Sequence, residues 1–177
     1  MNEISSLLSA TAAAFTALIF ARAAWHKLAD FTEFTGFVAD YRLVPETRVR
    51  TASAALVAVE VAIPVLLLIP ATQASGAVLA ILLFGLYALA MGINLLRGRT
   101  SVECGCGGAP TLLSPVLLVR NAVLAAIAAL VLVSAGTLQL SFGDAAAAVA
   151  LGFMLWVAFL LSEQVLANGI RARMLRR

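Results

Sequence analysis

The 177-residue chain is 63% hydrophobic and 12% charged, and its mean hydropathy is +1.03. A soluble domain has about 45–50% apolar and about 25% charged residues, so this composition excludes a water-soluble globular protein and indicates an integral membrane protein. The net charge of +3 comes from residues that flank apolar runs, and no basic face with interleaved aromatic residues predicts nucleic-acid binding.

Five apolar runs are long enough to cross a bilayer, which takes about 20 helical residues. In a single membrane domain that covers 1–177, we place them near residues 4–24, 51–70, 74–96, 115–135 and 145–167. The first run could be taken for a signal peptide, but it begins with Glu3 rather than a basic residue and closes on Arg22 rather than a small-residue cleavage site. We therefore expect a retained helix.

The connection after the first run is amphipathic. Its apolar residues recur at helical spacing: Phe31, Phe34, Val38 and Tyr41. This pattern predicts a short helix that lies on the lipid headgroups. We expect Pro45 to end this helix and residues 46–50 to lead into the second span. The helix either packs at the interface or acts as a docking or gating element over the cysteine loop that follows the third span.

Glu60 falls at the centre of the second span, where a charged side chain costs about 2.5–3.5 kcal/mol on insertion scales. It should face the bundle interior and be protonated or paired. One interpretation is an interhelical hydrogen bond to Tyr87 or Ser53. The other is proton uptake coupled to thiol oxidation, or contact with a quinone, which is the one cofactor that the sequence brings into consideration.

Cys104 and Cys106 are the two cysteines of the chain, and Gly105 separates them in the polar loop 97–114. Adjacent thiols can cycle between dithiol and disulfide or hold a soft metal, whereas cysteines kept for packing are usually single. A disulfide needs Cα atoms about 4.4–6.8 Å apart, which positions i and i+2 reach only if the backbone bends, as glycine permits. Such a short bridge is strained, which predicts a labile oxidant rather than a structural link.

Basic side chains precede and follow the cysteine pair. Cations stabilise a thiolate, and we expect them to outweigh the adjacent Glu103. The residues expected to support a thiolate are Arg22, Arg97, Arg99, Arg120 and Asn121. Arg120 has a second interpretation, in which its side chain only extends to the interface. For the pair itself, thiol exchange, binding of a soft metal and an inert loop stay open; no zinc site is predicted, because tetrahedral zinc needs four ligands.

Small residues in the fifth span predict close packing against a neighbouring helix or in a homodimer; they are residues 145–148 and Gly152. All twelve Lys and Arg residues fall in or beside the connections after the first and third spans, or in the tail. The positive-inside rule then predicts a multi-pass protein of a bacterial inner membrane, with its N-terminus outside and its C-terminus and cysteine loop in the cytoplasm.

A series of short motifs runs along residues 10–135: Ala21-Arg22-Ala23-Ala24-Trp25-His26-Lys27-Leu28, Asp40-Tyr41-Arg42-Leu43-Val44-Pro45, Val59-Glu60, Asn94-Leu95-Leu96-Arg97-Gly98-Arg99, Glu103-Cys104-Gly105-Cys106 and Val119-Arg120-Asn121. Together they resemble the methylamine utilisation MauE family, within the wider group of DoxX-like membrane proteins. Members commonly read Cys-x-Cys-Phe-Gly, whereas this chain has Gly107 in place of the Phe.

The resemblance implies a DoxX-like four-helix transmembrane bundle, here with a fifth span, in an all-α membrane protein. It also implies a redox-associated role in which disulfides form in an exported client, the methylamine dehydrogenase small subunit in the type case, alongside a thioredoxin-like partner. We therefore expect thiol–disulfide exchange through Cys104 and Cys106. The rival hypotheses are a copper carrier and a non-catalytic scaffold of an oxidoreductase complex.

The predicted orientation and the implied client lie on opposite sides of the membrane. A single cysteine pair cannot form a fixed relay across about 30 Å of hydrocarbon. Either the loop is reached from both sides in turn, or its electrons pass to or from a cytoplasmic donor or a quinone.

Overall fold

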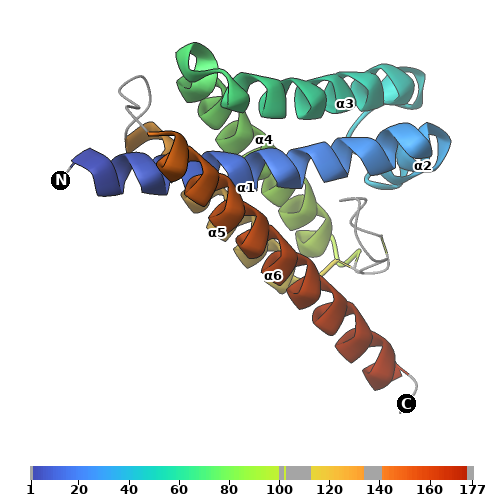
Figure 1. Ribbon diagram of the computed structural model, residues 1–177. Helices are drawn as coiled ribbons and strands as arrows, with labels where there is room; N and C mark the ends of the chain where they lie inside the picture. The colour runs from blue at the N-terminus through green and yellow to red at the C-terminus, as the bar shows by residue number, and fades with distance from the viewer. Residues whose placement is uncertain (1, 100–101, 103–112, 134–140, 175–177) are drawn as a thin grey trace.

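The computed structural model describes residues 2–99, 102, 113–133 and 141–174, and in these ranges the chain forms helices and no strand. In chain order the elements are α1 (Asn2–Ala29), α2 (Phe31–Asp40), α3 (Glu46–Leu68), the 3₁₀ turn η1 (Pro70–Thr72), α4 (Gln73–Leu96), α5 (Pro115–Leu130), the 3₁₀ turn η2 (Val131–Val133) and α6 (Phe142–Met174) (Figure 1). Long, apolar helices that could each cross a membrane are present at all five predicted places. In chain order these are α1, then α3, then η1 together with α4, then α5 together with η2, and finally α6. The prediction of an all-α membrane protein is confirmed.

The helices form a four-helix bundle with a fifth long helix on its outside. Helix α1 packs against α3 and α5, and α4 packs against the same two helices, so these four close into a ring. Helix α6 packs against α1, runs diagonally across the bundle and continues past it toward the C-terminus (Figure 1). This is the arrangement that the family resemblance implied.

Apolar side chains from all four bundle helices fill its centre. The rings of Phe20 and Phe84 lie 4.7 Å apart between α1 and α4, and Ile63, Leu124 and Val131 are buried around them. Because lipid tails are as apolar as these side chains, close packing rather than escape from water holds the helices together.

Helix α6 approaches α1 most closely at Gly152. A Cβ atom on Gly152 would lie 2.7 Å from Ala14 Cβ and 3.0 Å from the backbone nitrogen of Phe15, which leaves no room for a side chain. Two turns further along, the ring of Phe159 packs edge-on against Phe15 with 6.2 Å between the ring centres. The predicted close packing of the fifth span is therefore present, and its neighbour is α1.

Helix α1 is longer than the sequence predicted. It continues to Ala29 instead of ending near residue 24, so Lys27 lies within the helix and is 4% exposed, rather than in a loop. The assignment of Lys27 to the connecting loop was wrong, because the apolar run stops before the helix does. The side chain of Lys27 instead finds partners inside the bundle.

The predicted interfacial helix is present as α2, but Pro45 does not end it. Helix α2 ends at Asp40, and the chain then turns through Arg42, which has a left-handed φ of 49°. Pro45 is the N-cap of α3, and residues 46–50 form the first turns of α3 instead of a lead-in. Proline suits this place because a helix start needs no backbone N–H from it.

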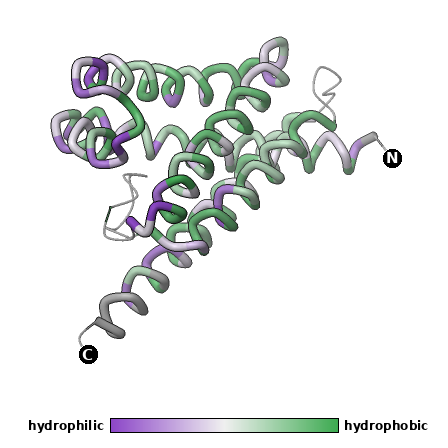
Figure 2. Tube along the Cα trace, turned by 180° about the vertical axis from the view of Figure 1, so that it is seen from behind, coloured by the Kyte–Doolittle hydropathy of each residue, from purple (hydrophilic) through white to green (hydrophobic). Residues whose placement is uncertain are grey.

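Hydrophilic residues gather at one end of the bundle. Figure 2 shows them where α1 turns into α2 and α3 and where α4 ends, while the spans are hydrophobic over most of their length. The candidate site lies at and just below this end.

Candidate functional site

Cys104 and Cys106 lie outside the described residues, whereas Val102 and Leu113, before and after them, are placed. The backbone N–H of Leu113 donates to the carbonyl oxygen of Val102 at 3.1 Å. Both side chains are buried, in a cluster with residues of α4 and α5. Val102 and Leu113, the described residues that flank the segment 103–112, therefore meet between the end of α4 and the start of α5.

The Arg-Gly-Arg motif ends α4. The N–H of Gly98 donates to the carbonyl of Leu95, and the N–H of Arg99 donates to the carbonyl of Asn94, both at 3.0 Å. Gly98 has a φ of +72°, so this is a Schellman cap with glycine in its left-handed position, where a side chain would be strained. The motif therefore serves to end the helix and turn the chain toward Val102.

Asn94 joins three parts of the chain beneath this cap. It is fully buried, and its Nδ2 donates to the carbonyl of Tyr41 at 3.2 Å, while its Oδ1 accepts from the guanidinium of Arg99 at 3.1 Å. The connection before α3, the end of α4 and the start of the cysteine loop are thus held together. Arg97, on the same turn, is exposed.

Tyr41 also lies near Arg120 of α5. Burial raises the pKa of the Tyr41 phenol to about 12, although the positive charge of Arg120 opposes part of this shift. The phenol therefore stays protonated at neutral pH. Tyr41 packs against the cluster that contains Val102 and Leu113, so the charge of Arg120 acts close to the base of the cysteine loop.

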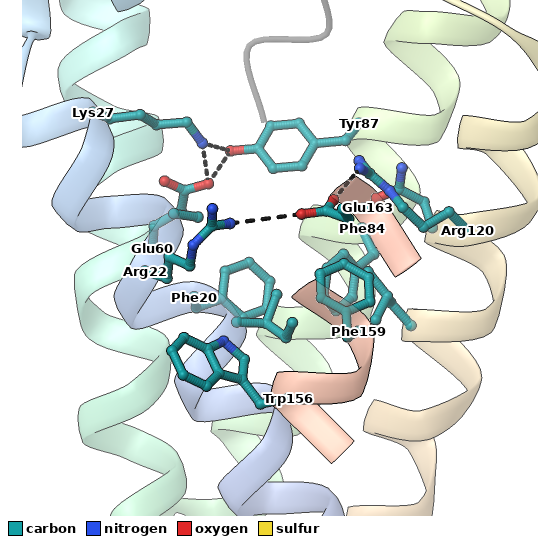
Figure 3. Close-up of a pocket in the computed structure, with 14 residues that line it drawn as sticks. Phe20, Arg22, Lys27, Glu60, Phe84, Tyr87, Arg120, Trp156, Phe159 and Glu163 are labelled. Carbon is teal, nitrogen blue, oxygen red and sulfur yellow. Dashed lines mark hydrogen bonds and ion pairs between the residues drawn. The ribbon is translucent and has the colours of Figure 1, made fainter. Parts of the chain in front are cut away.

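Lys27, Glu60 and Tyr87 form a hydrogen-bonded cluster inside the bundle (Figure 3). Lys27 Nζ donates to Glu60 Oε1, and the two side chains are 3% and 0% exposed. The hydroxyl of Tyr87 donates to the same oxygen at 2.6 Å, and Lys27 Nζ lies 3.3 Å from that hydroxyl. The predicted bond between Tyr87 and Glu60 is present, whereas Ser53 Oγ is buried with no hydrogen-bond partner among the described residues.

A second charged cluster joins α1, α5 and α6. Glu163 Oε1 accepts from Arg120 Nη1 at 2.7 Å, and Glu163 Oε2 lies 3.6 Å from Arg22 Nη1. Two guanidinium groups therefore share one carboxylate, which leaves a net positive charge at this place. Arg120 is paired within the protein, so its side chain does more than extend to the interface.

The two clusters line a small cavity of about 40 Å³ (Figure 3). A cavity needs about 10–15 Å³ of this kind of volume to hold one water molecule. Two buried atoms on residues that line it, Glu60 Oε2 and Trp156 Nε1, have no hydrogen-bond partner in the described part of the chain. The cavity is therefore large and polar enough for water. Asn121 also lines it, but its amide donates back to the carbonyl of Leu117 at 2.9 Å.

The structure thus divides the residues expected to support a thiolate into two groups. Arg22, Arg120 and Asn121 line the small cavity together with Glu60. Arg97 and Arg99 lie at the end of α4 and do not line that cavity. No three His, Cys, Asp or Glu side chains in the described ranges come together as a metal-binding group.

Sequence reasoning missed two members of the site, Lys27 and Glu163. Lys27 was assigned to a loop, and Glu163 was given no role although it falls inside the predicted fifth span. An ionisable residue within a span usually faces a partner or a cavity, so the position of Glu163 was a signal that could have found it.

Comparison with known proteins assigns the chain to a family. The family described as methylamine utilisation protein MauE matches residues 5–134. The chain belongs to the MauE family. Its match to the family ends before α6 begins, so Glu163 lies beyond that match.

Three relatives named methylamine utilization protein MauE show how far the likeness extends. The MauE protein of Methylorubrum extorquens is 38% identical over 171 residues, which cover 92% of this chain and 90% of the relative. The MauE protein of Paracoccus denitrificans is 40% identical over 116 residues, or 64% of this chain, and the chain spans 62% of that relative's length. The MauE protein of Methylophilus methylotrophus is 39% identical over 103 residues, 58% of this chain and 54% of the relative. No solved structure matches the chain.

Proposed function

We propose that this MauE-family protein exchanges thiols and disulfides at the membrane through Cys104 and Cys106, and so supports the maturation of an exported protein. The observation that carries the proposal is the hydrogen bond from Leu113 to Val102, with both side chains buried. This bond joins the two residues that flank the segment containing Cys-Gly-Cys, and both residues are packed in the cluster with Met91 and Leu117, which we call the base of the cysteine loop. In the exchange step, one thiolate attacks a partner's disulfide and releases one partner thiolate; the second thiolate then displaces the remaining partner sulfur and closes the new disulfide. The same steps in reverse pass the disulfide of this protein to a reduced partner.

The charges near this base favour the thiolate form that attacks. Arg22 and Arg120 outnumber the single carboxylate of Glu163, and Arg120 lies near Tyr41, which packs against the base of the loop. A nearby positive charge stabilises a thiolate and increases the fraction of thiol that can react.

The partners are proposed from the family resemblance. They are a thioredoxin-like protein and an exported client, in the type case the methylamine dehydrogenase small subunit. We place the protein in a bacterial inner membrane with its N-terminus outside and the cysteine loop on the cytoplasmic side, because all twelve Lys and Arg residues fall in or beside the connections after the first and third spans, or in the tail.

Reaction of the purified, oxidised protein with reduced thioredoxin tests the proposal. We expect one disulfide to be transferred per chain, with loss of turnover in both Cys104→Ser and Cys106→Ser, because neither variant can form the intramolecular disulfide. The double variant gives the background. If the oxidised parent protein transfers no disulfide and the reduced protein retains copper through its two thiols, the protein is a copper carrier; if it does neither, the scaffold hypothesis takes the place of this proposal.

A further inference from the structure

A second, larger cavity lies between α2, α3 and α4. Its volume is about 530 Å³, within the range of about 300–1,000 Å³ that is common for small-molecule sites. Leu82 and Leu86 of α4 line it while being 63% and 49% exposed, so the cavity opens toward the lipid. Phe34 and Val38 of the amphipathic helix α2 cover another side. A ligand would therefore enter from the hydrocarbon, not from water.

Polar groups are concentrated at one wall of this cavity. Lys27 and Tyr87 line both it and the small polar cavity, so they separate the two. Lys27 Nζ carries three N–H donors, and its bonds to Glu60 and Tyr87 account for two of them. The single O–H of Tyr87 donates to Glu60. The wall therefore has one further N–H, on Lys27, to offer to a ligand that accepts a hydrogen bond.

The ligand group that meets this wall should be uncharged. Glu60 already balances the charge of Lys27, and a phosphate or carboxylate brought beside them would be a buried charge without a partner. A carbonyl oxygen fits, because it accepts a hydrogen bond and adds no charge.

On α3 and α4 the wall lies part-way along the spans, and Lys27 reaches it from the last turn of α1, where its Nζ lies 4.9 Å from the centre of the Phe34 ring of α2. Glu60 follows Arg50 by ten residues on α3, and Tyr87 precedes Arg97 by ten residues at the end of α4. At 1.5 Å per residue each separation is about 15 Å, half of the roughly 30 Å hydrocarbon thickness. The headgroup of a phospholipid carries a charged phosphate, for which this wall has no partner.

We propose that the larger cavity binds an isoprenoid quinone, with a ring carbonyl accepting from Lys27 Nζ and the isoprenoid chain passing Leu82 and Leu86 into the lipid. A quinone combines the required features: an uncharged planar ring, carbonyl acceptors and an apolar chain that keeps it within the hydrocarbon.

The quinone site lies beside the base of the cysteine loop. Met91 and Tyr41 line the larger cavity, and both pack in the cluster that holds Val102 and Leu113. In a role that rests on the proposed function, the quinone is the oxidant of the cysteine pair. Two thiols lose two electrons and two protons to form one disulfide, and one quinone takes up both to become a quinol. Glu60 lines the small polar cavity, and its Oε2 has no hydrogen-bond partner in the described part of the chain. Glu60 is therefore placed to carry protons.

Binding of decylubiquinone in phosphatidylcholine nanodiscs tests the site. The protein carries Cys104→Ser and Cys106→Ser, so that the result does not depend on thiol chemistry. We expect Ala55→Phe, which fills the cavity from α3, to weaken binding at least tenfold, while Ala54→Phe, one residue away and not part of the lining, binds like the parent. Circular dichroism and monodisperse elution establish that each variant is folded.

A second comparison tests the polar wall. Decylbenzene has a similar chain and ring but no carbonyl, and we expect the parent to bind decylubiquinone at least tenfold more tightly. The paired variant Lys27→Met with Glu60→Met, which removes the donor without leaving an unpaired charge, should lose this preference. Equal binding of both compounds by the parent, or undiminished quinone binding by Ala55→Phe, would overturn the quinone site while leaving the proposed thiol exchange standing.

Discussion

Lys27 on α1 and Glu60 on α3 form an ion pair whose side chains are 3% and 0% exposed. Neither charge has access to water outside the bundle, so each depends on the other and on Tyr87. Burying two charges is costly even when they are paired, which makes a purely stabilising role a poor explanation for this arrangement. Its place between two cavities suits a group that binds a ligand and handles protons.

The first prediction concerns this ion pair. Lys27→Met alone should destabilise the protein by about 3–5 kcal/mol, because it leaves the Glu60 carboxylate buried without its cation. Lys27→Met combined with Glu60→Met should recover most of this loss. Unfolding in detergent mixtures, followed by circular dichroism, gives the comparison. Equal stability of the single and the paired variants would show that the two charges do not depend on each other.

The second prediction concerns the contact between α6 and α1. Gly152→Ala should cost about 1–3 kcal/mol, because its Cβ would overlap Ala14 and force the helices apart. Gly85→Ala is the matched control: Gly85 lies in α4 with no atom within 4 Å of an added Cβ, and the change should be neutral or stabilising by up to about 1 kcal/mol. The same unfolding assay applies. A neutral Gly152→Ala would mean that α6 does not pack on α1 as described.

Orientation is the subject of the third prediction. A reporter fused after Arg177 should be cytoplasmic, and one inserted at the exposed Ala71, in the turn between α3 and α4, should be external. The positive-inside rule gives this result because the basic residues gather at the other end of the bundle. The reverse pattern would place the cysteine loop outside.

The fourth prediction follows from the burial of Tyr41. Its pKa is raised to about 12 in the folded protein, against about 10 in an unfolded chain. The folded state therefore holds this proton more tightly, and the resulting stability is present below pH 10 and is lost as the pH rises toward 12. Tyr87→Phe leaves Tyr41 as the sole tyrosine, so ultraviolet absorbance reports its phenolate alone. A midpoint near pH 10 in the folded protein would contradict its burial.

Hydropathy predicted the five long helices and their order because each span must be apolar over about 20 residues. It could not predict where the helices end. Helix α1 continues past the apolar run to Ala29, since Lys27 is satisfied by Glu60 across the bundle and not by water. The sequence pattern indicated that Pro45 ends α2, whereas Pro45 begins α3. A proline at a boundary does not show on which side of it the helix lies.

The sequence predicted the site only in part, because several of its contacts depend on how separate helices pack together. The isolated charge of Glu60 indicated a buried partner, and Tyr87 is one. The pairing of Glu163 with Arg22 and Arg120 depends on how α6 packs against α1, which no pattern within a single span specifies. The larger cavity depends in the same way on how α2 folds over α3 and α4.

Redox titration of the cysteine pair tests the central claim most directly. The purified protein is equilibrated in glutathione buffers of increasing potential, free thiols are labelled with a maleimide that adds mass, and the fraction of labelled chains is measured. The account predicts that Cys104 and Cys106 change together, from two labels to none, with a potential above about −300 mV as expected of a labile disulfide. Thiols that stay labelled across the whole series, or that oxidise only between chains, would contradict it.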